Sequence, residues 1–446
     1  MRSSNNECEV LAEVWHTMRA STGLVAIRSR VFRAALVTTG FIHQSQYNRY
    51  RGMATALAAD AAATRSVKAC VLGGGIGGCS AVRYLDTNSL ALVEMGRGLG
   101  GRSSTRTSRD DPRIAINHGA PSADIRTREG ASIMKDLERG GYATKISGSE
   151  PTSSDILERW RGDPNMSTLC QGLTRGREFE TYFKTMVRRV EPIIVGDSVE
   201  GWTLLDKDNQ VILRTDWLIV SGSGAAHPRW RAAFKSEPPI IEAAREIDNE
   251  ELNNAIELIG SIDARPVQVA MMAFDASGQS SSAYWSSMPD NTSIIGTPGD
   301  DVLDKLVVTK SKGGSLVSIV AHSTTEFANT ANNVYGSKST AARIGGATSS
   351  AEREQEVLAE IMNAVAANLK QVSKGDCPVP TWGPFLHRWG NAFPEGEPLP
   401  YNKAIIKEAK LAFCGDFVGE KNTFGSIEGA LLSGKVVGEE LTKLLL

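Results

Sequence analysis

Short apolar runs separated by a glycine-rich turn begin at Val67 of this 446-residue chain. The run Ala69–Leu72 has the length and composition of a buried parallel strand. A second run, Leu90–Val93, is closed by Glu94, and the helix-length segment Cys79–Leu85 lies between the two runs. A glycine cluster joins the first run to the helix, so the order is strand, glycine turn, helix, strand and acid. This order predicts a βαβ unit that binds a dinucleotide.

The glycines of the turn have the G-x-G-x-x-G spacing, and each has a physical role. Gly73 permits a tight turn, Gly75 lets the backbone approach a pyrophosphate, and Gly78 lets the helix pack close to the strand. Glu94 is positioned to accept both hydroxyls of an adenosine ribose and would repel a 2′-phosphate, which leaves NAD or FAD as the ligand. The cofactor-binding candidates of the turn are Gly73, Gly75, Ile76, Gly77 and Gly78.

Beyond this unit, strand-like and helical patterns follow one another without a regular βα order. Trp202–Leu205, a polar turn and Val211–Leu213 predict a hairpin, and Asp216–Ser221 predicts a further buried strand. From about residue 228 to 394 the mixed pattern predicts an α+β domain with an antiparallel sheet. The helices expected there are Ile240–Ile259 and Ser350–Val372, and the strands are Val267–Phe274, Ser282–Met288, Lys305–Thr309 and Ser315–His322.

Composition and charge exclude several classes of function. The net charge of −2 gives no reason to expect nucleic acid as a partner. The six cysteines are scattered without a C-x-x-C pair, which argues against a zinc site or a dithiol redox centre. No uninterrupted apolar run is long enough to span a bilayer. We therefore expect neither a metal site nor a transmembrane segment.

Residues 1–65 differ in character from the rest of the chain and are interpreted as a leader. Between residues 18 and 65 arginine, serine, threonine and alanine are plentiful, and Asp60 is the one acid. Leu24–Val37 can form a helix with arginine and apolar residues on different faces. This composition resembles an organelle transit peptide, which would place the protein in a plastid or mitochondrion. Alternatively, Met53 is the start and the protein is cytoplasmic; both interpretations stay open.

A second glycine-rich stretch follows Glu94 and has the spacing G-R-G-x-G-G-R. Together with the segment N-H-G-A further on, it resembles the flavin amine oxidase superfamily and, within it, the renalase-like FAD-dependent oxidoreductases. The resemblance implies that the stretch lies along the FAD pyrophosphate and the entrance to the flavin. The cofactor-binding candidates that it adds are Arg97, Gly101 and Arg102.

The N-H-G-A segment carries both the resemblance and a departure from it. By resemblance, His118, Gly119 and Ala120 lie near the isoalloxazine ring of FAD. The sequence departs at Asn117, where an acid is usual, and at Pro121–Ala123, where glutamine and aromatic residues are usual. These departures affect the expected chemistry at the substrate side rather than the FAD assignment.

The last motif lies at the C-terminus, where a short strand ends in Gly415 and Asp416. By resemblance, Asp416 binds the ribityl chain or a phosphate of FAD, and the helix that follows points its N-terminus at the flavin. A helix N-terminus favours the negative charge of a reduced flavin. The candidates on this helix are Ile427, Gly429 and Ala430.

Aromatic and basic residues between 382 and 394 resemble the segment that leads back into the FAD domain of the same family. Arg388 is expected near the flavin pyrimidine edge; the alternative, an aromatic crossover with an interdomain salt bridge, is compatible with that position. The side chains that could line the substrate pocket are His118, His322, His387, Trp285 and Trp389, and each histidine is expected to be structural rather than catalytic.

The resemblance implies an α/β fold with a discontinuous Rossmann-type FAD-binding domain of p-hydroxybenzoate hydroxylase-like topology. Its segments are residues 66–130, 170–235 and 395–446. An α+β substrate domain, residues 236–394, is inserted, and residues 131–169 connect the two.

The function that follows is an FAD-dependent oxidoreductase. A small reduced substrate, an amine or a reduced nicotinamide, would give a hydride to flavin N5, and O2 or another acceptor would take the electrons. No catalytic residue is assigned, because this chemistry needs orientation and a dry pocket more than an acid or base. One alternative is a carotenoid or porphyrinogen desaturase, although the apolar docking stretch of such enzymes is missing. The other is a catalytically inactive FAD-binding protein with an assembly partner.

Overall fold

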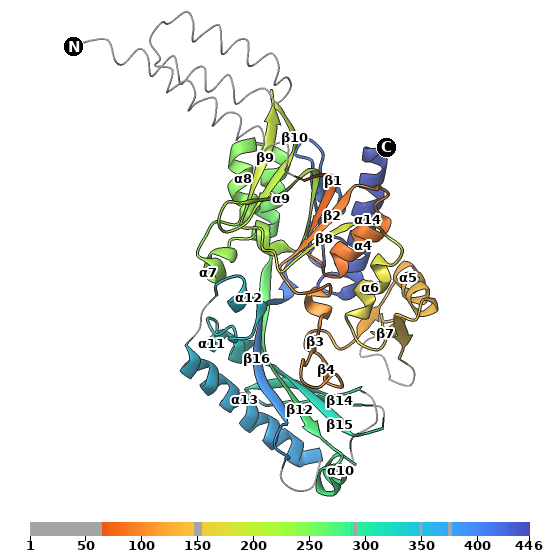
Figure 1. Cartoon of the computed structure of the whole chain (residues 1–446), viewed down its shortest axis with the longest axis vertical. Coiled ribbons are helices and arrows are strands. Elements are labelled where there is room, and N and C mark those ends of the chain that lie inside the picture. Colours follow the sequence, from red (N-terminus) through yellow and green to blue (C-terminus); the bar gives the residue numbers. More distant parts are fainter. Residues whose placement is uncertain are drawn as a thin grey trace, which may run out of the picture.

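The computed structural model describes residues 65–146, 154–286, 288, 292–311, 313–347, 350–372 and 377–446. Apart from Arg65, the expected leader lies outside these residues. Two sheets organise the chain, one at the top and one at the bottom of the view in Figure 1.

The first sheet has eight strands and a parallel centre. Its main path is β17-β18-β11-β1-β2-β8, and β10 and β9 extend it from β11. The pairs of β1 with β2 and β11, of β2 with β8 and of β11 with β18 are parallel. The strands are β1 (Ser66–Leu72), β2 (Leu90–Glu94), β8 (Glu180–Phe183), β9 (Arg189–Val195), β10 (Ser198–Leu205), β11 (Val211–Ser221), β17 (Ile405–Ile406) and β18 (Leu411–Cys414).

Helices cover both faces of this sheet, which explains why its central strands are almost continuously apolar. Helices α4 (Ile76–Tyr84) and α14 (Ile427–Leu445) pack on one face, and α8 (Pro239–Ile247) and α9 (Glu250–Gly260) on the other. A Cβ atom at Gly434 would lie 2.2 Å from the carbonyl oxygen of Gly77. Glycine is therefore required for α14, the C-terminal helix, to approach α4 this closely.

The second sheet is antiparallel, with the order β13-β14-β15-β12-β16. One face packs on α10 (Gln279–Trp285), α11 (Thr325–Thr330) and α13 (Ala351–Val372), and the other packs on Ile114 and Ile116 of the first domain. Its strands are β12 (Asp263–Asp275), β13 (Thr292–Gly296), β14 (Leu303–Lys310), β15 (Leu316–Ser323) and β16 (Trp382–Glu395). The predicted fold class, a Rossmann-type α/β domain with an additional antiparallel-sheet domain, is confirmed.

Smaller elements complete the space between the two sheets. A three-stranded sheet has the order β5-β7-β6 and packs with α5 (Arg128–Arg139) and α6 (Thr168–Thr174). The remaining elements are β3 (Thr105–Thr107), β4 (Ala115–Asn117), β5 (Ala123–Ile125), β6 (Ala143–Lys145), β7 (Glu158–Gly162), α7 (Trp230–Phe234), α12 (Thr340–Arg343) and three 3-10 turns at Gly101–Ser103, Ser223–Ala226 and Tyr401–Lys403.

Two sequence predictions of secondary structure are wrong. The helix expected over Ile240–Ile259 is two helices, because Asp248 has a φ of 49° and the Asn249 side chain accepts the backbone N–H of Leu252, which starts α9. The strand expected over Ser282–Met288 is helix α10, whose Trp285 packs on Phe274 of β12 with ring centroids 5.0 Å apart.

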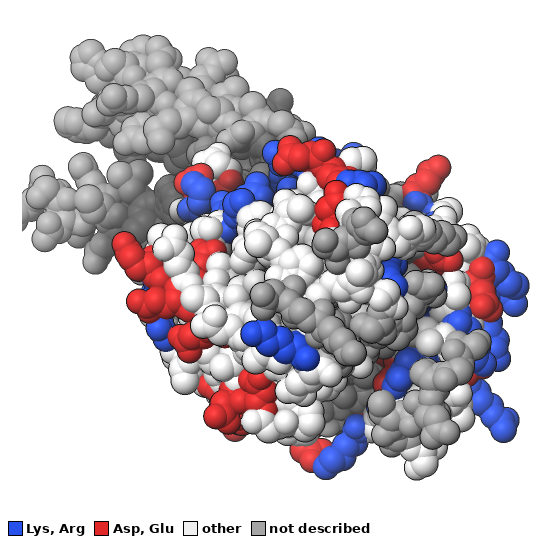
Figure 2. All heavy atoms as spheres, turned by 90° about the horizontal axis from the view of Figure 1, so that it is seen from below, with Lys and Arg blue, Asp and Glu red and all other residues white. Residues whose placement is uncertain are grey.

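Charged side chains of both signs surround the face of the molecule seen in Figure 2, and the centre of that face is mostly uncharged. Within the described residues, no helix is both long and apolar enough to cross a membrane.

Candidate cofactor and substrate site

The glycine turn after β1 has the geometry that the sequence predicts. Gly73 has a φ of 110°, and a Cβ atom there would lie 2.7 Å from the carbonyl oxygen of Ser221. A Cβ atom at Gly78 would lie 2.0 Å from the carbonyl oxygen of Gly73, so only glycine lets α4 begin this close to β1. At Gly75 a Cβ atom would meet only the Cα atom of Gly101, at 3.8 Å. The backbone at Gly75 is therefore open to a ligand.

Helix α4 begins at this turn without a side-chain cap. Gly75 is its N-cap residue and contributes no side-chain hydrogen bond. The first backbone N–H groups of a helix have no partner within the helix. The positive end of the helix dipole lies at the same place. The turn therefore suits a phosphate group.

Glu94, at the end of β2, faces the same cavity. Its carboxylate accepts the backbone N–H of Gly74 at 2.7 Å and that of Gly96 at 2.5 Å. Burial raises the pKa of Glu94, and the two backbone hydrogen bonds oppose that rise. A carboxylate has about four acceptor positions, so two remain for the hydroxyls of a ribose.

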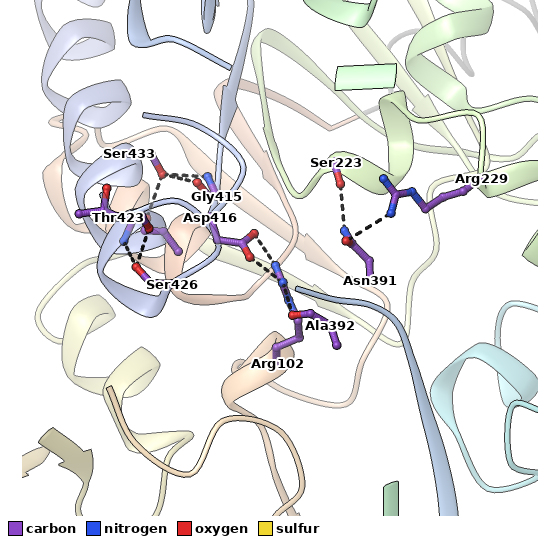
Figure 3. Close-up of polar contacts among 12 residues, drawn as sticks. Arg102, Ser223, Arg229, Asn391, Ala392, Gly415, Asp416, Thr423, Ser426 and Ser433 are labelled. Atoms are coloured by element: carbon purple, nitrogen blue, oxygen red, sulfur yellow. Dashed lines mark hydrogen bonds and ion pairs between the residues drawn. The ribbon is translucent and has the colours of Figure 1, made fainter. Parts of the chain in front are cut away.

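Arg102 joins the loop after β2 to the C-terminal motif (Figure 3). Its two terminal nitrogens donate to the carboxylate of Asp416 at 2.6 and 2.5 Å, and Nη1 also donates to the carbonyl oxygen of Ala392 at 3.0 Å. Burial alone would lower the pKa of Arg102, but the charge of Asp416 raises it above its usual value. This ion pair, with the bond to Ala392, fastens β16, the crossover strand, to the nucleotide-binding domain.

Ser433 fixes the end of β18 against α14 (Figure 3). Its hydroxyl accepts the N–H of Gly415 at 2.9 Å and lies 2.8 Å from the carbonyl oxygen of the same residue. Gly415 has a φ of 132°, which favours glycine. This conformation turns the chain so that Asp416 follows the strand directly into the cavity lining.

The N-terminus of α14 presents two of its three predicted residues to the cavity. Ile427 and Ala430 line it. Gly429 instead packs against the protein, where a Cβ atom would lie 2.2 Å from the carbonyl oxygen of Thr423. Ser426 caps the helix by accepting the N–H of Gly429 at 3.0 Å.

Glu428, which sequence reasoning missed, ties α14 to the smaller sheet. Its side chain is fully buried. It accepts the backbone N–H groups of Arg126 and Thr127, each at 2.8 Å, and the Thr127 hydroxyl at 2.6 Å. The available sequence signal was an acid two residues after a serine at the start of a helix.

The three residues of the H-G-A segment lie in different surroundings. Gly119 and Ala120 line the cavity, whereas His118 does not. His118 lies in a ring cluster, 5.4 Å from the centroid of Trp389 and 5.1 Å from that of His387. Burial, with the charge of Arg106, lowers the pKa of His118 to about 4. The ring is therefore neutral at physiological pH and supports the cavity wall from behind.

Asn117, where the sequence departs from the pattern that it otherwise resembles, has a structural role. Its side-chain oxygen accepts the backbone N–H of Met166 at 3.0 Å and lies 2.8 Å from the hydroxyl of Thr105. Asn117 does not line the cavity. A carboxylate could accept the same hydrogen bonds, so this exchange does not alter the cavity wall.

Several other sequence candidates lie away from the cavity. Arg97 is exposed and is not among the lining residues. Arg388 lies on the opposite face of the second sheet, where it donates to the carbonyl oxygen of Ala328 at 2.7 Å. Trp285 is buried in the core beneath that sheet. Of the remaining pocket candidates, His322 and Trp389 line the cavity and His387 does not.

Sequence reasoning also missed Asn391, which anchors the crossover strand (Figure 3). Its amide donates to the hydroxyl of Ser223 at 3.0 Å and accepts from Arg229 at 3.4 Å. The cationic residues at the far end of the cavity were missed as well, because no local motif marks them. They are Arg126, Arg159, Arg161 and Lys305.

The lining residues named above belong to one cavity of about 1130 Å³. It begins at the glycine turn and Glu94, passes Arg102, Asp416 and the N-terminus of α14, and reaches Lys305 and Trp389 of the second sheet. Pockets for drug-sized ligands typically measure about 300–1,000 Å³. The cavity is therefore large enough for an extended ligand. Among the described residues, no group of three or more potential ligands is arranged to hold a metal ion.

Comparisons with known proteins agree with this geometry. A family model described as an NAD(P)-binding Rossmann-like domain matches residues 71–129. Those residues contain the glycine turn, Glu94 and the second glycine-rich stretch, so this part of the chain is a dinucleotide-binding Rossmann-like domain.

Solved structures resemble the chain over most of its length. A double mutant of putrescine oxidase, from a redesign of cofactor binding, matches with a TM-score of 0.50 and 11% identity, covering 85% of this chain and 100% of that chain. A triple mutant from the same work matches with a TM-score of 0.50, 10% identity and the same coverage. At this identity the likeness concerns the fold alone. A search of curated protein sequences finds no match.

Proposed function

We propose that the chain is an FAD-dependent oxidoreductase of the renalase-like type. The observation that supports this most directly is the single cavity that connects the dinucleotide-binding turn to the second sheet. FAD, when bound, supplies a flavin ring that accepts a hydride and passes the electrons to O2 or another acceptor. The oxidoreductases that the sequence resembles, and the putrescine oxidase that the fold resembles, agree with this assignment.

The described residues fit FAD along the whole cavity. Glu94 would accept the adenosine ribose hydroxyls, and the open backbone at Gly75 with the N-terminus of α4 would hold the pyrophosphate. Asp416 would bind beyond the pyrophosphate, followed by Ile427 and Ala430 at the flavin ring. Gly119 and Ala120 line the cavity without bulky side chains.

The N-terminus of α14 favours FAD over NAD. A nicotinamide ring is positively charged when oxidised and neutral when reduced, whereas a flavin becomes negative on reduction. The positive end of a helix dipole stabilises negative charge by about 0.3–2 kcal/mol. Ile427 and Ala430 bring that end to the cavity wall. A flavin fits this electrostatic environment in both redox states.

The residues of this chain would orient the substrate and exclude water. Apolar and aromatic side chains of the second sheet, including Val267, Ile294 and Trp389, line the far end of the cavity. Hydride transfer requires alignment of donor and acceptor and is favoured by the exclusion of water. We assign no acid or base to a side chain.

Anaerobic reduction of the purified flavoprotein tests this proposal. Amines, amino acids and reduced nicotinamides are added separately, and bleaching of the visible flavin bands is followed by stopped flow. We expect one class to bleach the flavin and air to restore the colour. A correctly folded, colourless protein would contradict FAD binding. A flavin that none of the donors reduces would contradict the oxidoreductase and favour the inactive FAD-binding alternative.

A further inference from the structure

The second sheet presents two basic side chains to the cavity. Strand register places Gly296, Lys305, His322, Val269 and His387 in one row across the sheet. Directly paired residues of antiparallel strands project from the same face. Lys305 and His322 both line the cavity. They are therefore neighbours on its wall.

His322 has an unsatisfied polar atom at this wall. Its side chain is 6% exposed, and Nε2 has no hydrogen-bond partner among the described residues. Buried polar atoms are nearly always hydrogen-bonded, so Nε2 of His322, unpaired in a cavity wall, is available to bind a ligand. Burial, with the charge of Lys305, lowers the pKa of His322 to about 3. The ring is therefore neutral and can present an N–H group to a ligand.

The smaller sheet contributes cations to the same cavity. Arg159 and Arg161 alternate with Trp160 along β7, so both project from the face opposite Trp160. Arg159 pairs with Asp124 at 2.6 Å. Within the described part of the chain, no ion pair involves Arg161. Arg126, which lines the same cavity, pairs with Asp155 at 2.8 Å. Arg161 thus differs from Arg126 and Arg159, because no acidic partner among the described residues balances its charge.

The acids of the cavity do not balance the cations at its far end. Asp416 is paired with Arg102, and Glu94 accepts backbone N–H groups at the opposite end. Among the residues that the structure describes, Lys305 pairs with one acid, Asp304 at 3.5 Å, whose side chain is 60% exposed and does not line the cavity. Arg161 and Lys305 therefore leave the far end positive. An ammonium group entering there would be repelled, and an anion would be attracted.

We propose that Arg161, Lys305 and Nε2 of His322 form a subsite for an anionic oxygen group, a carboxylate or a phosphate, on the substrate. This inference rests on the proposed function, because the cavity is taken to hold flavin and substrate together. It selects an acidic substrate and disfavours a cationic amine, although the fold resembles an oxidase whose name denotes a diamine. The subsite anchors the substrate and takes no part in the hydride transfer itself.

Calorimetric titration of the holoprotein with sodium phosphate, sodium benzoate and benzylamine, at constant ionic strength, tests the subsite. Arg161→Met and Lys305→Met should each weaken binding of at least one anion by about tenfold or more, the loss expected for a charge-assisted hydrogen bond. Lys305→Arg should restore most of the affinity. Arg109→Met and Lys403→Met remove the same charges from exposed positions outside the cavity, and their effect should be below about twofold.

The two anions identify the group that is bound. If the methionine substitutions weaken the binding of phosphate alone, the substrate carries a phosphate. If they weaken the binding of benzoate alone, it carries a carboxylate. The proposal is overturned if neither anion binds, if both methionine variants bind the anions like the wild type, or if benzylamine binds more tightly than either anion.

Two further measurements keep these outcomes interpretable. Thermal melting shows whether the methionine variants fold, and Arg161→Gln and Lys305→Gln replace them if they do not. The flavin content is measured in parallel. Protein without flavin contradicts the proposed function. Flavin-replete protein whose anion affinity does not change in the methionine variants contradicts the subsite alone.

Discussion

The two ends of the cavity are built by different means. At the nucleotide end, the backbone determines the shape of the site. Glycines at positions 73, 75 and 78 shape the turn, and two backbone N–H groups hold the carboxylate of Glu94. At the substrate end, side chains from β7, β14, β15 and β16 line the cavity, because two sheets face it. The nucleotide end should therefore tolerate almost no added volume. The substrate end should tolerate side-chain exchange and respond in its choice of ligand.

The Arg102–Asp416 pair connects these two ends, and breaking it should have the largest effect. Removing one partner of a buried ion pair costs about 3–5 kcal/mol, because the other charge is left buried and alone. Arg102→Met should therefore lower the free energy of unfolding by about 3 kcal/mol, discounted toward the low end because the Arg102 side chain is 34% exposed. Urea denaturation of the flavin-free proteins, wild type and variant, measures this change in the free energy of unfolding.

The double variant Arg102→Met with Asp416→Asn is the matched control. It removes the uncompensated charge, so it should recover part of the lost stability. A double variant less stable than Arg102→Met would show that the pair contributes through something other than charge.

Adding one methyl group at the nucleotide end should have the next largest effect. A Cβ atom at Gly78 would overlap the carbonyl oxygen of Gly73, whereas at Gly98 it would meet nothing within 4 Å. Overpacking typically costs about 1–3 kcal/mol. Gly78→Ala should fall in that range and lose bound flavin, and Gly98→Ala should resemble the wild type in melting and flavin content. Equal behaviour of the two variants would contradict a nucleotide end built by close backbone packing.

Glu94→Gln tests the ribose contact with a smaller expected effect. The amide keeps the shape but supplies one acceptor oxygen in place of two, so FAD affinity should fall about tenfold, as for one hydrogen bond to a charged group. Because burial raises the pKa of Glu94, wild-type affinity should also fall with decreasing pH before an ordinary glutamate would protonate. Fluorescence titration of the apoprotein measures both effects, and Glu94→Gln should abolish this pH dependence. An FAD affinity of Glu94→Gln equal to that of the wild type would contradict a contact between Glu94 and the ribose.

The histidine behind the substrate wall should give the smallest effect at neutral pH. The pKa of His118 is about 4 in the folded chain, against an ordinary value of 6.5. Between these values the unfolded chain binds the proton more readily, so the free energy of unfolding falls as the pH decreases from 6.5 to about 4. His118→Asn should reduce this slope by up to about 1.4 kcal/mol per pH unit. Plotted against pH, the free energies of unfolding of the wild type and His118→Asn should be parallel above neutral pH. Curves that are parallel at every pH would contradict a buried, neutral His118.

The same contrast explains what the sequence could predict. The glycine turn and Glu94 were predicted because short-range spacing determines their conformation, whereas the Gly415–Asp416 motif was predicted through the resemblance. The break before α9 also had a local signal, since Asn249 followed by two glutamates is an N-cap pattern. The strand expected at Ser282–Met288 lacked the alternation of polar and apolar residues that a half-buried strand shows.

The substrate end could not be predicted, because it depends on strand register. Lys305 and His322 become neighbours only through the pairing of β14 with β15, and Arg161 reaches the cavity from a separate sheet. Arg388 shows the same difficulty: it is one residue from Trp389, and alternation along β16 directs it to the opposite face. A resemblance that names a motif does not determine which of its side chains face the ligand.

Identification of the nucleotide released from the purified, denatured full-length protein tests the central claim most directly. The account predicts FAD in an amount equimolar with the protein, with a visible flavin spectrum before denaturation and loss of both in Gly78→Ala. Release of NAD, or of no nucleotide from protein that folds and has been supplied with FAD, would contradict it.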